Sequence, residues 1–133
     1  MTSANMLKSY QQVGIETRFE GASPHALIAL LFKGLLEKLA TARCAVDSGD
    51  VPAQGHSISQ AIAIVDGLRA SVDREGGGEI ATNLLDIYDF LETYLVKANI
   101  DHDMEMLNVA RSIVMELSTA WDAIPEEERA LVQ

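Results

Sequence analysis

The longest apolar pattern in the chain follows the glycine run at 76–78. Between Ile80 and Ala98, apolar residues recur at three- and four-residue spacing, which predicts an α-helix. Their arc covers roughly 240° of the helical wheel, whereas a surface helix needs little more than 100°. Only Asp86, Asp89, Thr82, Thr93 and Lys97 mark a polar strip. A helix of this kind must be surrounded by several other segments.

A second helix is predicted to begin at Ser23 and Pro24, which supply an N-cap hydroxyl and a first-turn proline. It should end before Gly49, a residue suited to the left-handed conformation at a helix end. Leu30 and Leu36 lie outside its main apolar arc. This helix therefore also has more apolar surface than a single packing face requires.

The next helix is predicted to be capped by Asp50, with Pro52 in its first turn. Because glycine weakens a helix, Gly55 should delay the regular part to about His56. The apolar stripe that follows has helical spacing and consists of Ile58, Ala61, Ile62, Val65, Leu68 and Val72.

The last helix is predicted to be capped by Asp101 or Asp103 and to end before Pro125. Its apolar seam is Leu107, Ala110, Val114, Leu117, Trp121 and Ile124. Long helices joined by short turns pack as antiparallel neighbours. The sequence therefore predicts an all-α protein, an antiparallel up-and-down four-helix bundle over residues 23–124. A short amino-terminal arm (1–22) precedes it and an acidic tail (125–133) follows it.

Composition and charge narrow the range of functions. The formal net charge is −10, and beyond Arg74 the acidic residues far outnumber the basic ones. This balance argues against nucleic acid and against an anionic membrane surface as partners. The chain shows no secretory signal pattern and no apolar run long enough to span a membrane. With a single cysteine it needs no oxidising compartment, so we expect a cytoplasmic protein.

No group of residues predicts catalysis or a cofactor. His25, His56 and His102 lack the Glu-x-x-His spacing of a di-iron bundle, so they are interpreted as solvated or capping residues. The acidic run at 101–105 lacks the glycine of a calcium loop. Cys44 is interpreted as a small residue packed in the bundle. We therefore expect no enzyme activity, no metal and no cofactor.

The apolar surplus of the helices remains to be explained. Such surface marks a protein-binding groove, a dimer face or an aggregation risk. A groove would take an amphipathic helix or an extended segment of another protein, with the amino-terminal arm as a temporary cover. Permanent burial by the arm is the other interpretation, and a helical-bundle protein that binds a cofactor or ligand is the alternative function.

Several stretches resemble the flagellin-specific export chaperones, the FliS family. The resemblance covers about residues 7 to 124, although Phe90 stands where a tyrosine is common and the helix that follows Asp50 is poor in lysine. The stretches are Tyr10-Gln11-Gln12-Val13, Ala22-Ser23-Pro24-His25-Ala26-Leu27-Ile28, Leu31-Phe32-Lys33-Gly34, Gly49-Asp50, Ile64-Val65-Asp66-Gly67-Leu68, Gly77-Gly78-Glu79-Ile80-Ala81-Thr82-Asn83-Leu84, Ile87-Tyr88-Asp89-Phe90, Ala98-Asn99 and Ala120-Trp121.

The resemblance implies a cytosolic type III export chaperone. Such a protein binds the disordered carboxy-terminal segment of flagellin, prevents premature polymerisation and delivers flagellin to the flagellar export apparatus. The resemblance places Tyr10 and Gln11 in an arm near the binding groove. It places Asn83 and Tyr88 on a surface, shared by family members, of the helix that follows the glycine run. Helical-wheel geometry adds Ile64, Leu68 and Leu91 as groove lining. Whether an export-gate component or an anti-sigma factor also binds is left open.

Overall fold

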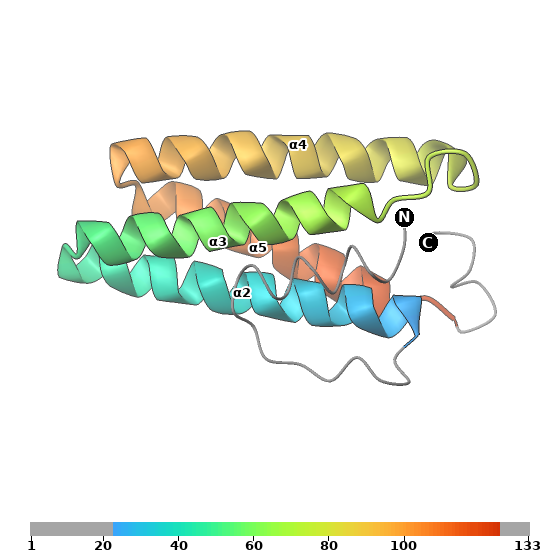
Figure 1. The fold of residues 1–133 in the computed structure, drawn as a ribbon, viewed down its shortest axis with the longest axis horizontal. Coiled ribbons are helices and arrows are strands. Elements are labelled where there is room, and N and C mark those ends of the chain that lie inside the picture. Colours follow the sequence, from blue (N-terminus) through green and yellow to red (C-terminus); the bar gives the residue numbers. More distant parts are fainter. Residues whose placement is uncertain (1–22, 126–133) are drawn as a thin grey trace.

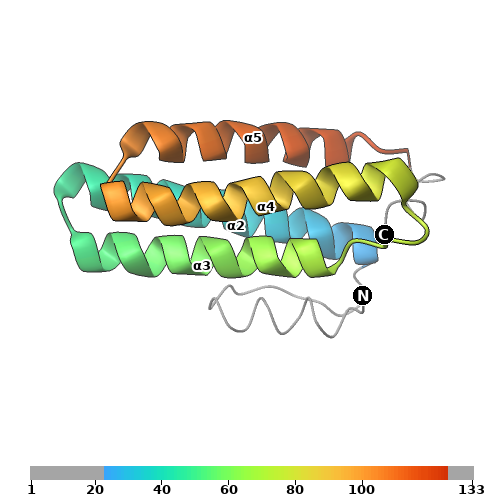
Figure 2. The same ribbon diagram turned by 90° about the horizontal axis from the view of Figure 1, so that it is seen from above.

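The computed structural model describes residues 23–125, which form four α-helices, labelled α2 to α5 as in Figure 1. They are α2 (Pro24–Ser48), α3 (Val51–Ala70), α4 (Gly78–Asp101) and α5 (Met104–Asp122). Each helix packs against its neighbours in the chain, and α5 also packs against α2, so the four close a ring (Figures 1 and 2). The predicted all-α antiparallel up-and-down bundle is confirmed. The arm (1–22) and nearly all of the tail lie outside the described residues.

Local contacts fix both ends of α2 and the start of α3. The Ser23 hydroxyl accepts a hydrogen bond from the N–H of Ala26 at 3.1 Å and caps α2. Gly49 follows α2 with a φ of 73°, which only glycine adopts without strain. The Asp50 carboxylate then accepts a hydrogen bond from Ala53 N–H at 3.1 Å, which starts α3 immediately.

The prediction that α3 becomes regular only near His56 was wrong, because α3 begins at Val51. The side chain of Gln54 is buried and its Nε2 donates to the carbonyl oxygen of Asn99, at 3.0 Å, and to the Asn99 side-chain oxygen, at 2.8 Å. These bonds to α4 order the first turns of α3. Tertiary contacts therefore outweigh the propensity cost of Gly55, which is only about 1 kcal/mol.

The turn between α3 and α4 is organised by Asp73. Its carboxylate accepts hydrogen bonds from the N–H groups of Glu75, at 3.1 Å, and Gly76, at 2.9 Å. A Cβ atom at Gly77 would lie 2.7 Å both from the Ala81 Cβ and from the carbonyl oxygen of Asp73. The close approach of the turn to the first turn of α4 therefore requires glycine at this position.

A reciprocal contact joins the start of α2 to the end of α5. The Nε2 of His25 lies 2.9 Å from the carbonyl oxygen of Trp121, while the Trp121 Nε1–H donates to the carbonyl oxygen of His25 at 3.0 Å. The two rings stack with centroids 4.8 Å apart and planes 9° from parallel. His25 is buried, so its interpretation as a solvated or capping residue was wrong.

The interpretation of His102 as a solvated or capping residue is confirmed, because His102 is exposed and is the C-cap of α4, with a positive φ of 51°. Its Nδ1 also lies 3.0 Å from Oε1 of Gln54. The expectation for Cys44 needs correction. Cys44 is exposed on α2 and is not packed in the bundle. His56 is exposed, as expected.

The core runs along the whole bundle and receives side chains from all four helices. The largest fully buried apolar side chains are Phe32, Leu31, Leu35, Leu39, Ile58, Ile64, Leu68, Leu91, Leu95 and Leu107. The polar strip predicted for α4 is exposed, as expected. Burial in this core, at roughly 1.5–3 kcal/mol for each large apolar side chain, is what holds the helices together.

Candidate partner-binding surface

A groove between α2 and α5 contains apolar residues of α2 that pack at the edge of the core and are only half-buried. It has a volume of about 600 Å³ and is lined by Ala26, Ala29, Leu30, Lys33, Leu36, Ser118 and Asp122. Leu30 and Leu36 are the two residues that the helical wheel placed outside the main arc of α2. Both are half-buried, so part of each side chain is available to a ligand.

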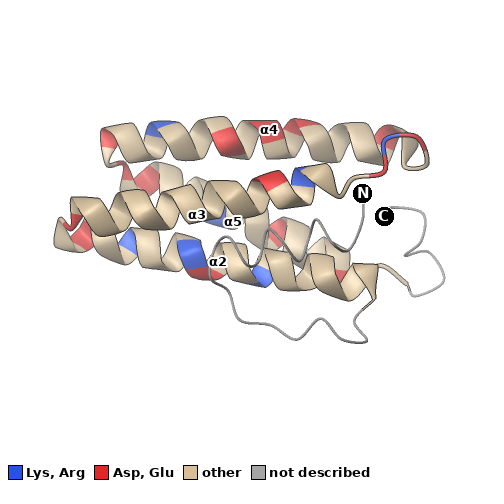
Figure 3. Cartoon of the chain, viewed as in Figure 1, with Lys and Arg blue, Asp and Glu red and all other residues tan. Residues whose placement is uncertain are grey.

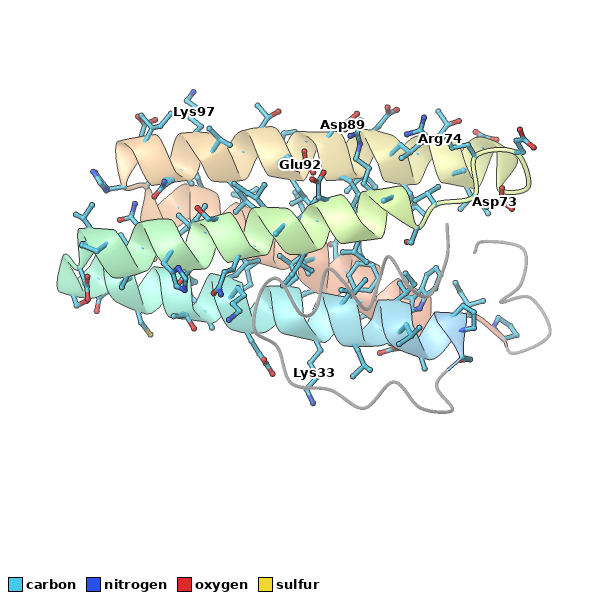
Figure 4. The ribbon with its side chains drawn as sticks, viewed as in Figure 1. Lys33, Asp73, Arg74, Asp89, Glu92 and Lys97 are labelled. Carbon is cyan, nitrogen blue, oxygen red and sulfur yellow. The ribbon has the colours of Figure 1, made fainter. Side chains whose placement is uncertain are left out.

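The shape and chemistry of this groove suit a polypeptide segment. From Ala26 to Leu36 it extends over eleven residues of helix, whose ten steps of 1.5 Å give roughly 15 Å. The small side chains of Ala26 and Ala29 allow another backbone to approach closely. Lys33 and Asp122 place one positive and one negative charge at its border, and Lys33 extends away from the bundle in Figure 4.

A second apolar surface lies on the flank of α4 that faces away from α3. Ile87, Phe90 and Tyr94 recur there at three- and four-residue spacing, and the rings of Phe90 and Tyr94 stack with centroids 4.9 Å apart. Phe90 is 46% exposed. Because Glu92 and Asn99 on the opposite flank interact with α3, this apolar flank borders α5.

The electrostatic environment of α4 and α5 is acidic. Within residues 78–125, acidic side chains recur along both helices, and the basic ones are Lys97 and Arg111 (Figure 3). Negative charge of this kind favours basic over acidic partners and keeps a protein with exposed apolar side chains in solution.

The residues predicted to bind a partner do not share one environment. Tyr10 and Gln11 lie outside the described residues. Asn83 is exposed on α4, whereas Tyr88 is only 3% exposed. Burial raises the pKa of the Tyr88 hydroxyl above its usual value of 10.0, because the phenolate would lose its hydration. In this conformation Asn83, unlike Tyr88, offers its side chain to a ligand.

The groove lining predicted from the helical wheel lies in the core. Ile64, Leu68 and Leu91 are fully buried in the core that all four helices share. They could contact a ligand only if the helices moved apart, so their role in binding stays a prediction. The structure instead directs attention to Ala26 and Ala29, which sequence reasoning missed. Their small size at successive turns of α2 was the available signal.

The described helices offer little that would suit other classes of function. Among residues 23–125, no group of three or more His, Cys, Asp or Glu side chains is placed to hold a metal ion. None of the described helices has the length and apolar character needed to cross a bilayer.

Comparison with known proteins adds an independent line of argument. The model of the family described as "Flagellar protein FliS" matches residues 6–128, which include all four helices. The flagellar secretion chaperone FliSB of Pseudomonas aeruginosa is 41% identical over 124 residues, which is 93% of this chain and 98% of that protein.

Relatives from other bacteria are similar over the same span. The flagellar secretion chaperone FliS of Salmonella typhimurium is 41% identical over 125 residues, 93% of each chain. The protein of the same name from Bacillus subtilis is 27% identical over 129 residues, 97% of this chain and 92% of that one. The similarity therefore extends over almost the full length of each protein.

Proposed function

Because the chain belongs to the FliS family, we propose that it is a flagellar secretion chaperone that binds the carboxy-terminal segment of flagellin in the cytoplasm. Its role is to keep this segment from polymerising and to deliver flagellin to the type III export apparatus. The observation that carries the proposal is the family match over residues 6–128, with relatives at 41% identity that are named flagellar secretion chaperones.

The uncovered apolar surface supports this role physically. A disordered client loses chain entropy when it is ordered, so useful affinity requires a long contact with several apolar anchors. The α2–α5 groove and the Phe90–Tyr94 flank of α4 supply such anchors on different sides of the bundle. A segment that wraps around the bundle can reach both, whereas a compact ligand cannot.

The alternative function, a bundle that binds a cofactor or another small ligand, is not favoured. The relatives are named as chaperones, and this naming also supports the expectation that the chain is not an enzyme. We propose no nucleic-acid partner and no insertion into a membrane. An export-gate component and an anti-sigma factor stay open as further partners.

A calorimetric titration of the full chain with a peptide of the flagellin carboxy-terminal segment tests the proposal. We expect saturable binding at roughly micromolar concentration. A folded, monomeric sample that shows no binding at roughly tens of micromolar would contradict the proposal. Phe90→Ser should weaken binding, because it removes an exposed aromatic anchor.

Val51→Ser is the matched control for this experiment. Val51 is 53% exposed, comparable to Phe90, but it lies at the start of α3, away from both proposed surfaces. It should leave peptide affinity unchanged. Equal losses in the two variants would indicate that general surface hydrophobicity, and not the α4 flank, determines binding.

A further inference from the structure

Two acidic side chains meet at the interface of α3 and α4. The side chain of Glu92 on α4 forms a hydrogen bond with that of Asp66 on α3. Oε1 of Glu92 is buried and accepts no hydrogen bond from an N–H or O–H group of residues 23–125. Figure 4 shows Glu92 between the two helices. Asp66 is exposed on α3, so it is Glu92, which is half-buried, that lacks the donors that usually surround a buried carboxylate.

A hydrogen bond between two carboxyl groups requires a proton on one of them, because an ionised carboxylate can only accept. The pKa of Glu92 is accordingly raised from 4.5 to about 7, first by burial, then by the hydrogen bond to Asp66 and the charge of Asp66. Asp66 on α3 thus helps to keep Glu92 on α4 protonated.

Arg69 is the cation that could neutralise this pair. It does lower the pKa of Glu92, but its Nε lies 2.8 Å from the Oδ1 of Asp89, on the exposed side of the interface. This contact is an ion pair by distance, and the Nε–H does not point at the oxygen. Since Asp89 already neutralises much of the Arg69 charge and itself raises the pKa of Glu92, the carboxyl pair is left without full compensation.

We propose that Asp66 and Glu92 form a pH-sensitive latch, which holds α3 to α4 while the two carboxyls share a proton and loosens the interface when both are ionised. Release of that proton places two negative charges against each other, beside the third charge of Asp89. Repulsion then replaces a hydrogen bond, and the helices separate at this point.

The position of the latch gives it structural consequences. Leu91 precedes Glu92 on α4 and is fully buried. Ile64 and Leu68 lie two positions to either side of Asp66, so they point to the opposite side of α3 from its carboxylate. Opening the interface at the carboxyl pair therefore acts first on the surroundings of Leu91. The latch does not depend on the identity of any ligand.

Amide hydrogen exchange around Leu91 in the full chain tests the latch. Exchange rates at about pH 6 and about pH 8, corrected for the intrinsic effect of pH, give the opening constant of the interface. For a group that titrates near 7 when folded and near 4.5 when exposed, linkage predicts a rise of up to about tenfold over this range. A wild-type opening constant that does not change with pH would overturn the proposal.

Glu92→Gln and Asp66→Asn should each abolish the rise, because an amide can donate to the remaining carboxylate at every pH. Asp86→Asn is the control, since Asp86 is an exposed carboxylate on the same helix and should retain the wild-type rise. A rise in Glu92→Gln equal to that of the wild type would exclude the carboxyl pair as its origin. An NMR titration of the Glu92 carboxyl carbon gives an independent result, and a midpoint near 4.5 would also overturn the proposal.

Discussion

His25 and Trp121 each bind the backbone of the other with a ring nitrogen, although 96 residues separate them in the chain. The contact fastens the first turn of α2 to the last turn of α5 and thereby closes the ring of four helices. Hydrogen bonds and ring stacking between the same two residues make the closure specific to this pair.

Replacing His25 should therefore destabilise the bundle. His25→Ala removes both the ring stacking and the bond to the Trp121 carbonyl, and we expect a loss of about 2–3 kcal/mol in the free energy of unfolding. His25→Phe keeps an aromatic ring and should lose about 1 kcal/mol. Urea unfolding followed by circular dichroism measures both values. His56→Ala, at an exposed histidine, is the control and should change the stability by less than about 0.5 kcal/mol.

Two glycines near the α2–α3 connection should respond in opposite ways to alanine. Gly49 has a φ of 73° and Gly55 has ordinary helical geometry, and neither has an atom within 4 Å of an added Cβ. Gly49→Ala should cost about 1–2 kcal/mol through backbone strain alone. Gly55→Ala should stabilise the protein by about 0.5–1 kcal/mol, because alanine favours the helix. Thermal unfolding measures both changes, and effects of the same sign would contradict this account.

Alkaline pH should unfold the bundle through Tyr88. Burial raises the pKa of its hydroxyl above the value of 10.0 that applies in the unfolded chain. The folded state then holds this proton more tightly than the unfolded state, so the contribution of Tyr88 is complete below pH 10.0 and is lost as the pH rises above it. Tyr88→Phe should move the midpoint of alkaline unfolding to higher pH. Phenolate absorbance of the wild type should show Tyr88 ionising together with unfolding, and ionisation in the folded protein would contradict the prediction.

The α2–α5 groove can be filled by a single substitution. Ala29→Phe places an aromatic ring in the groove, so it should weaken flagellin-peptide binding by at least about tenfold, which corresponds to about 1.4 kcal/mol. Ala40→Phe is the control, because Ala40 is exposed on the same helix and does not line the groove. Calorimetry should show unchanged affinity in the control. Unchanged affinity in Ala29→Phe would exclude the groove from the binding surface.

Hydrophobic periodicity was sufficient to predict the helices, because each carries a long apolar stripe, and α2, α3 and α5 also begin at a capping side chain, whereas α4 does not. Ser23, Asp50 and Asp103 all cap as expected. The errors arose where a tertiary contact determines the outcome. Gly55 was given too much weight because nothing in a local window reveals that Gln54 is anchored by Asn99 of α4.

The binding surface was less predictable for a related reason. A helical wheel identifies apolar residues in excess, as it did for Leu30 and Leu36, but it does not say which interface buries the others. Ile64, Leu68 and Leu91 have the same character as groove residues and lie in the core. Only the packing of the four helices against one another distinguishes the two groups.

The two ends of the bundle differ in how they are built. At one end, Gly49 with Asp50 and His102 with Asp103 form tight connections between successive helices. At the other, the start of α2 and the end of α5 are tied together by His25 and Trp121. Ser23 and Pro125, the first and last residues that the structure describes, consequently lie at the same end of the bundle. Immobilising the protein by the opposite end, at the connections between α2 and α3 and between α4 and α5, would leave the His25–Trp121 contact free.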